Sequence, residues 1–251
     1  MLFLRSLLFT SLQIISTVLF SLLGVLLWPL PFKWRYKITS KWARFNLWML
    51  EKICGISYQV EGLEHISDEP CIIMCKHQSA WETLALQVIF PQQVWVLKRE
   101  LLWIPFFGWG LAALNPIAID RSAGRKALSQ VVKQGKDRLS SGSWVVIFPE
   151  GTRIPSGKIG RFGIGGAKLA IESGVNIIPV AHDAGKAWPK RGFIKYPGKI
   201  NMVIGEKIMV EESTATQLNN RVFQWIEDQM TRLEGSPPKI SVKKDKHSGK
   251  N

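Results

Sequence analysis

The first fifty residues contain no aspartate or glutamate, although six lysines and arginines lie among them. They include an uncharged run, residues 6–32, that is rich in Leu, Phe, Ile and Val. At about 1.5 Å per residue, a helix of this length crosses a hydrocarbon core of roughly 30 Å. The apolar region of a cleaved signal peptide has only about 7 to 15 residues. We therefore expect a retained membrane segment.

The basic residues of this end gather after the apolar run, between residues 33 and 44. Pro29 and Pro31 are expected to end the helix, and Trp28 and Trp34 are suited to the membrane interface. Because basic flanking residues favour the cytoplasmic side, we expect the bulk of the chain there, at the inner (cytoplasmic) membrane.

Residues 41–53 repeat apolar side chains at helical spacing. This basic, Trp-containing pattern is typical of a helix at a membrane surface, but a helix that packs on a core has it too, and both interpretations stay open. We assign residues 1–54 to an N-terminal membrane segment with this interfacial helix, and 55–234 to one α/β domain. Residues 235–251 have five lysines, one acid and little to bury, which predicts a basic disordered tail.

Only three cysteines, Cys54, Cys71 and Cys75, occur; they suit a reducing compartment and imply no disulfide framework. On a strand, Cys71 and Cys75 would lie about 13 Å apart, too far to share one metal ion, so no metal site is expected. The chain has no G-x-S-x-G serine motif, and its glycine-rich residues 160–170 lack the P-loop spacing.

The formal net charge of +14 indicates an anionic partner, and acidic lipid, a phosphorylated metabolite and nucleic acid all qualify. No nucleic-acid motif occurs, and the basic residues crowd beside membrane-like sequence. We therefore expect no nucleic-acid partner.

From residue 55 onward, short β-rich apolar runs alternate with helical patterns. This order predicts an α/β fold with a central mixed or parallel sheet flanked by helices. The expected strands are 71–75, 94–97, 116–120, 144–148, 177–180 and 200–204, and the expected helices are 81–90, 125–139, 165–173 and 214–233.

The stretch "CKHQSAWE", residues 75–82, follows an expected strand, where ligands gather in α/β sheets. His77 and Glu82 would point about 140° apart within one regular helix. They can meet if His77 lies in the loop and Glu82 in the first helical turn. The carboxylate would then hold one ring nitrogen and leave the other free to take a proton. Ordinary helix capping is the alternative.

The second such stretch, "FPEGTR" at residues 148–153, also follows a buried strand. Gly151 permits close backbone approach, Thr152 offers a hydroxyl, and Arg153 offers a planar fork suited to phosphate oxygens. A tight turn with a solvent-facing arginine is the alternative. His182 and Asp183 could also reach this region, or serve only a loop.

Together these segments resemble a known family. "KHQSAWE" is similar to the H-x4-D box, and "FPEGTR" to the phosphate-binding box, of the glycerolipid acyltransferase superfamily, above all the 1-acyl-glycerol-3-phosphate acyltransferases. "NPIAIDR" at 115–121 and "VNIIPV" at 175–180 resemble its second and fourth boxes. The family usually has Asp in place of Glu82, and some relatives, including lipid A acyltransferases, have Glu.

The resemblance implies that His77 is the general base, oriented by Glu82. It implies that an acceptor phosphate is held by Arg153, Arg121, Lys98, Thr152, Gly151 and Glu150. The expected reaction transfers an acyl chain from acyl-CoA or acyl carrier protein to the free hydroxyl of 1-acyl-glycerol 3-phosphate, giving phosphatidic acid in phospholipid biosynthesis. The expected partners are a membrane lysophospholipid, the donor and the membrane surface, without a metal or redox cofactor.

Two other functions stay open. One is the same chemistry on lyso-ornithine lipid, another lysophospholipid or a lipid A precursor. The other is a non-catalytic, membrane-tethered protein that binds anionic lipid. The apolar residues 101–114, "LLWIPFFGWGLAAL", suit either the entry of an acyl chain or a buried hydrophobic turn.

Overall fold

The computed structural model describes residues 1–211 and 213–241. Its centre is a seven-stranded sheet with the order β1-β8-β7-β2-β5-β3-β4. All strands predicted from the sequence are present, each within two residues of its expected ends. The strands of this sheet are β1 (Ile56–Glu61), β2 (Ile72–Cys75), β3 (Gln93–Lys98), β4 (Ile117–Ile119), β5 (Trp144–Ile147), β7 (Ile177–His182) and β8 (Gly198–Ile204).

The sheet is mixed, which is one of the two arrangements that the sequence left open. The five strands from β7 to β4 run parallel to one another. Strand β8 is antiparallel to β7, and β1 pairs parallel with β8. Every residue of β2, β5 and β7 is buried, because helices cover both faces of a parallel sheet.

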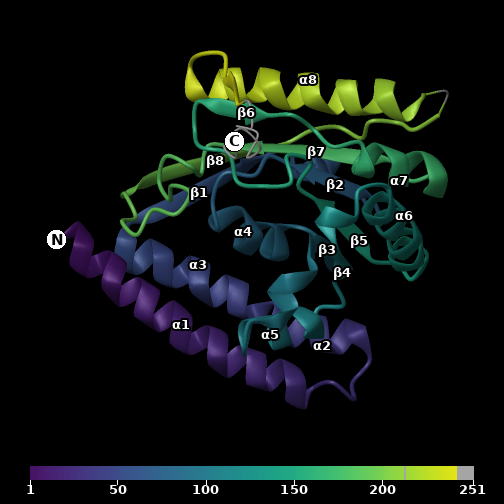
Figure 1. Ribbon diagram of the computed structural model, residues 1–251. Coiled ribbons are helices and arrows are strands. Elements are labelled where there is room, and N and C mark those ends of the chain that lie inside the picture. Colours follow the sequence, from purple (N-terminus) through teal and green to yellow (C-terminus); the bar gives the residue numbers. More distant parts are fainter. Residues whose placement is uncertain (212, 242–251) are drawn as a thin grey trace, which may run out of the picture.

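The helices form two layers (Figure 1). One layer, α1 to α5, covers one face of the sheet over a core that contains Trp81 and Trp144, and α6 to α8 cover the other face over a core that contains Ile72 and Met74. The helices are α1 (Leu2–Leu26), α2 (Phe32–Thr39), α3 (Lys41–Cys54), α4 (Trp81–Ile89), α5 (Phe107–Ala113), α6 (Arg125–Ser140), α7 (Gly165–Ser173) and α8 (Ala215–Glu234).

Helix α1 reverses the pattern of a water-soluble surface helix. Its buried residues are mostly small or polar, namely Ser6, Phe9, Ser16, Ser21 and Gly24. Large apolar side chains point outward, among them Leu4, Leu8, Ile15, Leu19 and Leu26, all more than half exposed. Small residues allow close helix packing, and an outward apolar face suits lipid. By length and composition, α1 is also able to cross a membrane.

Helix α3 confirms that residues 41–53 pack on a core, and the interpretation as a membrane-surface helix stays a prediction for its outer side. Ala43 and Leu50 are fully buried in the core. Phe45 and Trp48 are exposed on the outer side, where their rings stack with centroids 6.0 Å apart. The helix therefore packs on the domain and presents an aromatic outer surface.

Three strands were not predicted from the sequence. Strand β1 lies before the first expected strand, and β9 (Lys239–Ser241) lies in the segment predicted to be disordered. Strand β9 pairs in parallel with β6 (Lys158–Gly160), so the prediction of disorder is wrong for residues 239–241. Three residues are too few for periodicity to predict a strand. The rest of that segment, 242–251, lies outside the described residues.

Candidate active site

The carboxyl ends of the parallel strands share one edge of the sheet, where both polar motifs meet. His77 follows β2, Lys98 ends β3, Arg121 follows β4 and Arg153 follows β5. All four side chains line one cavity of ≈ 680 Å³. The fold therefore gathers an imidazole and three cations that are far apart in the sequence.

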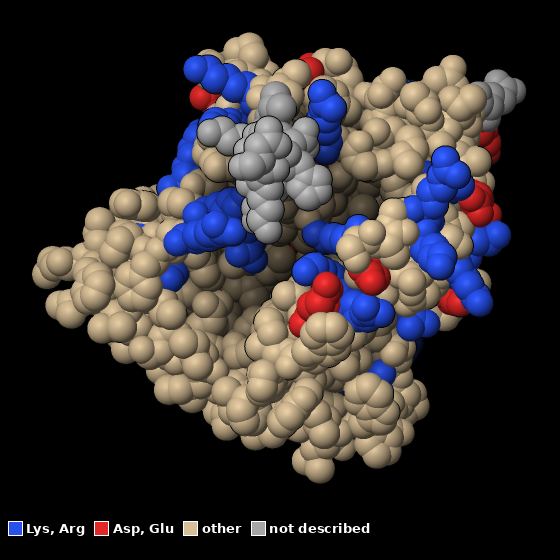
Figure 2. Space-filling view, viewed as in Figure 1, with Lys and Arg blue, Asp and Glu red and all other residues tan. Residues whose placement is uncertain are grey.

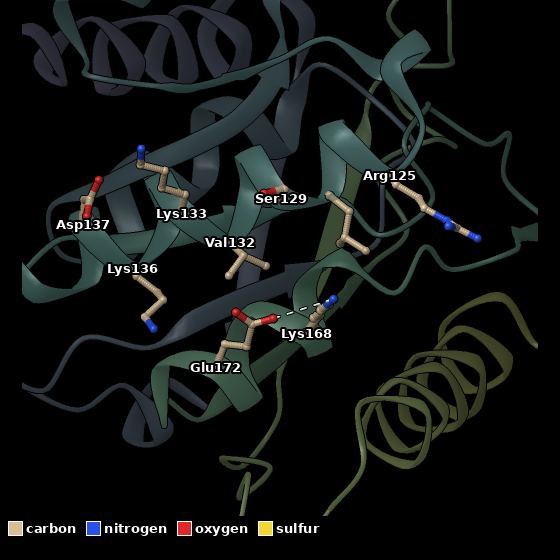
Figure 3. A pocket seen from close by; sticks show the side chains of 9 residues that line it. Arg125, Ser129, Val132, Lys133, Lys136, Asp137, Lys168 and Glu172 are labelled. Atoms are coloured by element: carbon tan, nitrogen blue, oxygen red, sulfur yellow. Dashed lines mark ion pairs between the residues drawn. The ribbon is translucent and has the colours of Figure 1, made fainter.

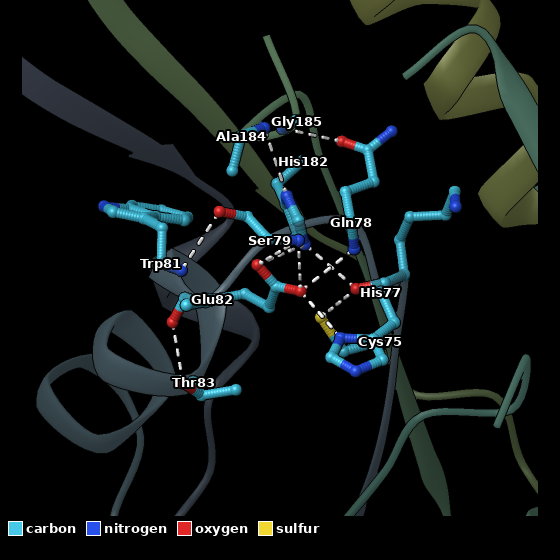
Figure 4. A network of polar contacts seen from close by, with 12 residues as sticks. Cys75, His77, Gln78, Ser79, Trp81, Glu82, Thr83, His182, Ala184 and Gly185 are labelled. Atoms are coloured by element: carbon cyan, nitrogen blue, oxygen red, sulfur yellow. Dashed lines mark hydrogen bonds and ion pairs between the residues drawn. The ribbon is translucent and has the colours of Figure 1, made fainter. Parts of the chain in front are cut away.

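The side chains of His77 and Glu82 face each other (Figure 4). Nδ1 of His77 lies 2.8 Å from Oε1 of Glu82. A carboxylate oxygen only accepts, so Nδ1 carries the proton and Nε2 is the ring nitrogen able to take another. The imidazole stacks on Phe148 with ring centroids 3.9 Å apart. Figure 4 thus shows the loop and first-turn arrangement that the sequence requires for this pair to meet.

Glu82 is fully buried, and its oxygens also accept the N–H groups of Gln78 and Ser79 at 2.9 to 3.0 Å. Burial raises the pKa of Glu82. The electrostatic influence of His182, the hydrogen bond and charge of His77 and the Ser79 N–H outweigh burial, so the pKa lies below its ordinary value. Glu82 is therefore a carboxylate at neutral pH and stabilises an imidazolium at His77.

His182 reaches the site, behind Glu82 rather than in the cavity. Its Nε2 lies 2.9 Å from the carbonyl oxygen of Lys76, and its Nδ1 accepts the Ala184 N–H at 3.2 Å. The neutral ring protonated at Nε2 satisfies both contacts, and burial lowers the pKa of His182. His182 is thus a neutral support for the loop before His77. Asp183 serves its own loop by accepting the N–H of Asn201 at 2.8 Å.

The expectation that Glu150 contacts a phosphate is wrong. Its side chain is fully buried and pairs with the equally buried Lys76, at 2.8 Å from Nζ to Oε1. It also accepts the N–H of His77 at 2.9 Å and that of Gly160 at 2.8 Å. The carboxylate therefore fixes the loop that carries His77. A further bond, from the Ile154 N–H to the His77 carbonyl at 2.7 Å, joins the two motifs.

The other residues assigned to phosphate binding do line the cavity. Arg121 donates to the carbonyl oxygen of Gly151. Gly151 has a φ of 66°, a left-handed conformation that favours glycine. Lys98 pairs with Glu100 at 3.1 Å, and Arg153 and Thr152 complete the group. Lys98 and Arg121, from the ends of β3 and β4, therefore line the same cavity as Arg153 of the motif that resembles a phosphate site.

The acyltransferase family model matches residues 57–183, which contain all of these strand-end motifs. The chain belongs to the acyltransferase family. A protein of Pseudomonas aeruginosa named 1-acyl-sn-glycerol-3-phosphate acyltransferase is 45% identical over 248 residues, covering 92% of this chain and 96% of that protein. The human 1-acyl-sn-glycerol-3-phosphate acyltransferase alpha is 31% identical over 142 residues, covering 56% of this chain and 50% of that protein.

A solved structure has the same fold. The crystal structure of the 1-acyl-sn-glycerophosphate (LPA) acyltransferase PlsC of Thermotoga maritima matches with a TM-score of 0.77 and 25% sequence identity, over 92% of this chain and 95% of that one. This chain is accordingly an acyltransferase with a mixed α/β sheet and an apolar N-terminal helix.

In this acyltransferase the cavity has an apolar arm. Beyond His77 it runs between the sheet and helices α1 and α5, lined by Phe20, Trp95, Leu101, Phe107, Leu111 and Leu114. Four of these residues come from the stretch 101–114, and its Trp103 and Trp109 are exposed. The stretch therefore lines the cavity on one side and presents aromatic side chains outside on the other.

The C-terminal helix also supports the site, which the sequence did not predict. Glu234, the last residue of α8, accepts bonds from Ser156 Oγ at 2.7 Å and the Gly157 N–H at 2.6 Å. Gln78 Nε2, beside His77, lies 3.2 Å from the same carboxylate. Glu234 thus ties the loops that follow β2 and β5 to the end of α8.

A second hollow of ≈ 640 Å³ lies between α6 and α7, on the other face of the sheet (Figure 3). It is lined by basic side chains, Arg125, Lys133, Lys136 and Lys168, of which Lys168 pairs with Glu172 at 3.7 Å. Its lining includes no residue of the two motifs. The residues of the two motifs that line a cavity therefore line the one beside His77.

Proposed function

We propose that this acyltransferase acylates the free hydroxyl of 1-acyl-glycerol 3-phosphate, using an acyl thioester, and so forms phosphatidic acid in phospholipid biosynthesis. The observation that carries the proposal is one cavity in which a carboxylate-oriented imidazole lies with Lys98, Arg121 and Arg153. The names of the relatives from Pseudomonas aeruginosa and Thermotoga maritima support this acceptor.

In the proposed reaction, Nε2 of His77 takes the proton of the lipid hydroxyl as its oxygen bonds to the thioester carbonyl carbon. The carbonyl oxygen becomes an oxyanion. The carbon–sulfur bond then breaks, and the thiolate recovers the proton from the His77 imidazolium. An ester and a free thiol result, and no metal or redox cofactor takes part. Glu82 stabilises the imidazolium between the two proton transfers.

Backbone N–H groups of the second motif suit the oxyanion. The Gly151 N–H is already taken, because it donates to the Phe148 carbonyl at 3.0 Å. Among the described residues, the N–H groups of Thr152 and Arg153 have no acceptor. We assign oxyanion stabilisation to these two donors, which lie at the cavity.

The acceptor phosphate is assigned to Arg121 and Arg153, assisted by Lys98. A phosphate monoester carries about −1.5 to −2 charges near pH 7, which two guanidinium groups match. Its binding energy would position the reacting hydroxyl at His77, so a group remote from the reaction raises the rate.

Helix α1 supports attachment to one leaflet of the inner membrane, with the active site on the cytoplasmic side. It contacts the domain along its whole length: Ser6 accepts the Lys195 N–H at 2.9 Å, Ser16 accepts Trp42 Nε1 at 3.2 Å, and Gly24 packs against Ala113. A helix docked in this way lies along the membrane surface. A reporter at residue 1 that is accessible only from the periplasmic side would contradict this.

The test is acyl transfer by the purified protein in lipid vesicles, with acyl-CoA and acyl carrier protein as donors. The acceptors are 1-acyl-glycerol 3-phosphate, lyso-ornithine lipid and a monoacylglycerol, offered singly and in competition. We expect at least a tenfold preference in kcat/KM for the phosphate-bearing acceptor. Preference for a phosphate-free acceptor would overturn the proposal, and absence of transfer to every acceptor would favour a lipid-binding tether.

A further inference from the structure

The cavity beside His77 holds a second group of cations. Besides Lys98, Arg121 and Arg153, its lining includes Lys190 and Arg191, from the loop between β7 and β8. Figure 2 shows lysines and arginines on opposite sides of a hollow, and the acidic side chains near it lie beside one side only. The family model ends at residue 183, before Lys190 and Arg191.

Other lysines of the same loop have structural partners. Lys186 pairs with Asp183 at 3.6 Å. Lys195 is buried, donates to Thr10 Oγ1 at 2.8 Å and lies over the ring of Trp188. Among the described residues, Lys190 and Arg191 have no hydrogen bond, ion pair or cation–π contact from their side chains. The two cations that face the cavity are therefore uncompensated.

The charge of one acceptor phosphate is matched by the cations at the strand ends alone, without those of the loop. One of the three cations at the strand ends, Lys98, already pairs with Glu100, so the net charge of about +2 matches one phosphate monoester. Lys190 and Arg191 add two more positive charges. A cavity with twice the charge that one acceptor phosphate needs suits a second phosphate-bearing substrate.

We infer that Lys190 and Arg191 bind the phosphate at the end of the pantetheine arm of the acyl donor. This inference rests on the proposed function, because a thioester donor is the second substrate of the reaction. Acyl-CoA and acyl carrier protein both carry a phosphate at that place. The acyl chain would occupy the apolar arm and the thioester would lie at His77, so the pantetheine arm leads out toward the loop.

The backbone of the loop is fixed in a way that presents these side chains. Arg191 has a φ of 58°, in the left-handed region where glycine is favoured. The Gly192 N–H donates to the Pro189 carbonyl at 2.9 Å and closes the turn. Phe193 packs on Phe3 of α1, with ring centroids 5.3 Å apart. The loop therefore holds an arginine where a turn prefers glycine, next to the membrane helix.

The test compares donors that differ in this phosphate. Wild type and the double variant Lys190→Gln/Arg191→Gly are assayed with acyl-CoA, acyl carrier protein and acyl-N-acetylcysteamine, a thioester without phosphate, all with the same acyl chain. Glycine suits the φ of 58° at 191, so the turn is kept. Lys199→Gln, an exposed cation on β8, is the matched control.

We expect KM for acyl-CoA and acyl carrier protein to rise at least tenfold in the double variant. For acyl-N-acetylcysteamine, and for the lysolipid acceptor with any donor, KM stays within about twofold. Equal losses with all three donors, or a rise confined to the KM of the acceptor, would overturn the inference. A rise for only one phosphate-bearing donor would identify the donor that uses the site.

Failure of the proposed function can be told apart from failure of this inference. If wild type prefers another acceptor, the same comparison of donors is made with that acceptor. Its outcome then tests only whether Lys190 and Arg191 bind the donor phosphate. If wild type transfers no acyl chain, direct binding of a non-hydrolysable acyl-CoA thioether to wild type and double variant decides, and equal dissociation constants would overturn the inference.

Discussion

Glu82, in the first turn of α4, and Glu150, in the loop after β5, make similar contacts with opposite consequences. Each carboxylate is fully buried, accepts backbone N–H groups and has one basic nitrogen at 2.8 Å. The partner of Glu150 is Lys76, which is 0% exposed, whereas the partner of Glu82 is His77, 15% exposed at the cavity. The two carboxylates thus pair with adjacent residues. We call Lys76–Glu150, which is closed to the cavity, the sealed pair, and His77–Glu82, which reaches the cavity, the open pair.

In the proposed mechanism, the difference decides which of the two buried pairs takes part in proton transfer. An imidazole takes and releases protons near neutral pH, and the contact of Nδ1 with Glu82 leaves Nε2 of His77, a residue that lines the cavity, able to do so. The buried ammonium of Lys76 has no access to the cavity. Its pair fixes the backbone at residue 77, because Glu150 also accepts the His77 N–H. The sealed pair therefore supports the open one.

The largest effect is expected from Glu82→Gln, which sharpens the contrast by removing the charge from the open pair only. The amide keeps the size of the side chain but neither fixes the Nδ1–H tautomer nor stabilises the imidazolium. We expect kcat to fall by roughly 10² to 10⁴-fold, with thermal unfolding within a few degrees of wild type. Steady-state kinetics and calorimetry check this, and near-normal kcat would show that the pair is a helix cap.

The sealed pair is broken by Glu150→Gln, which leaves the ammonium of Lys76 buried without a counter-charge. We expect a loss of about 3 to 5 kcal/mol in the free energy of unfolding, measured by denaturant titration. The double variant Lys76→Met/Glu150→Leu should recover much of this loss, because apolar residues replace both charges. Wild-type stability for the single variant would contradict the burial of the pair.

A smaller effect is expected from Glu234→Ala, which releases both loops from α8. Loss of the hydrogen bonds from Ser156, Gly157 and Gln78 to a charged group should cost about 1 to 3 kcal/mol. Hydrogen exchange should rise in residues 76–79 and 155–160. Glu227→Ala, a nearby α8 variant, serves as the control, and equal exchange in both variants would contradict this support.

The smallest effect concerns pH. Burial lowers the pKa of His182, so below about pH 6.5 the unfolded chain binds a proton that the folded chain resists. The contribution of His182 to the free energy of unfolding is fully present above that pH and is lost as the pH falls. His182→Gln keeps a donor toward the Lys76 carbonyl but does not titrate. The variant should therefore show a weaker fall in Tm between pH 6.5 and 5, and an identical fall would contradict the neutral imidazole.

The sequence predicts the open pair better than the sealed one for a physical reason. His77 and Glu82 are five residues apart, so local geometry alone tells which arrangement lets them meet. Lys76 and Glu150 follow different strands, and only the pairing of β2 with β5 brings them together. The burial of Glu150 also cannot be predicted from "FPEGTR", because a carboxylate between Pro and Gly is typical of an exposed turn.

For the fold too, features set by local sequence are predicted and features set by distant contacts are not. Long apolar strands and helices carry a periodic signal, and their order predicts the α/β sheet. Strand β9 and the contacts of Glu234 depend on where α8 ends relative to distant loops, and no local pattern encodes that. Lys190 and Arg191 were missed because a basic loop is ordinary in so basic a chain. Only the three-dimensional cavity distinguishes them from Lys186 and Lys195.

Single-turnover acyl transfer by His77→Ala, beside wild type in the same vesicles, tests the central claim most directly. We predict that the rate of ester formation falls by at least a hundredfold, while binding of 1-acyl-glycerol 3-phosphate and the Tm change little, because the arginines and the Lys76–Glu150 pair are untouched. A variant that binds lipid and transfers the acyl chain at the wild-type rate would contradict proton transfer by His77 and the account built on it.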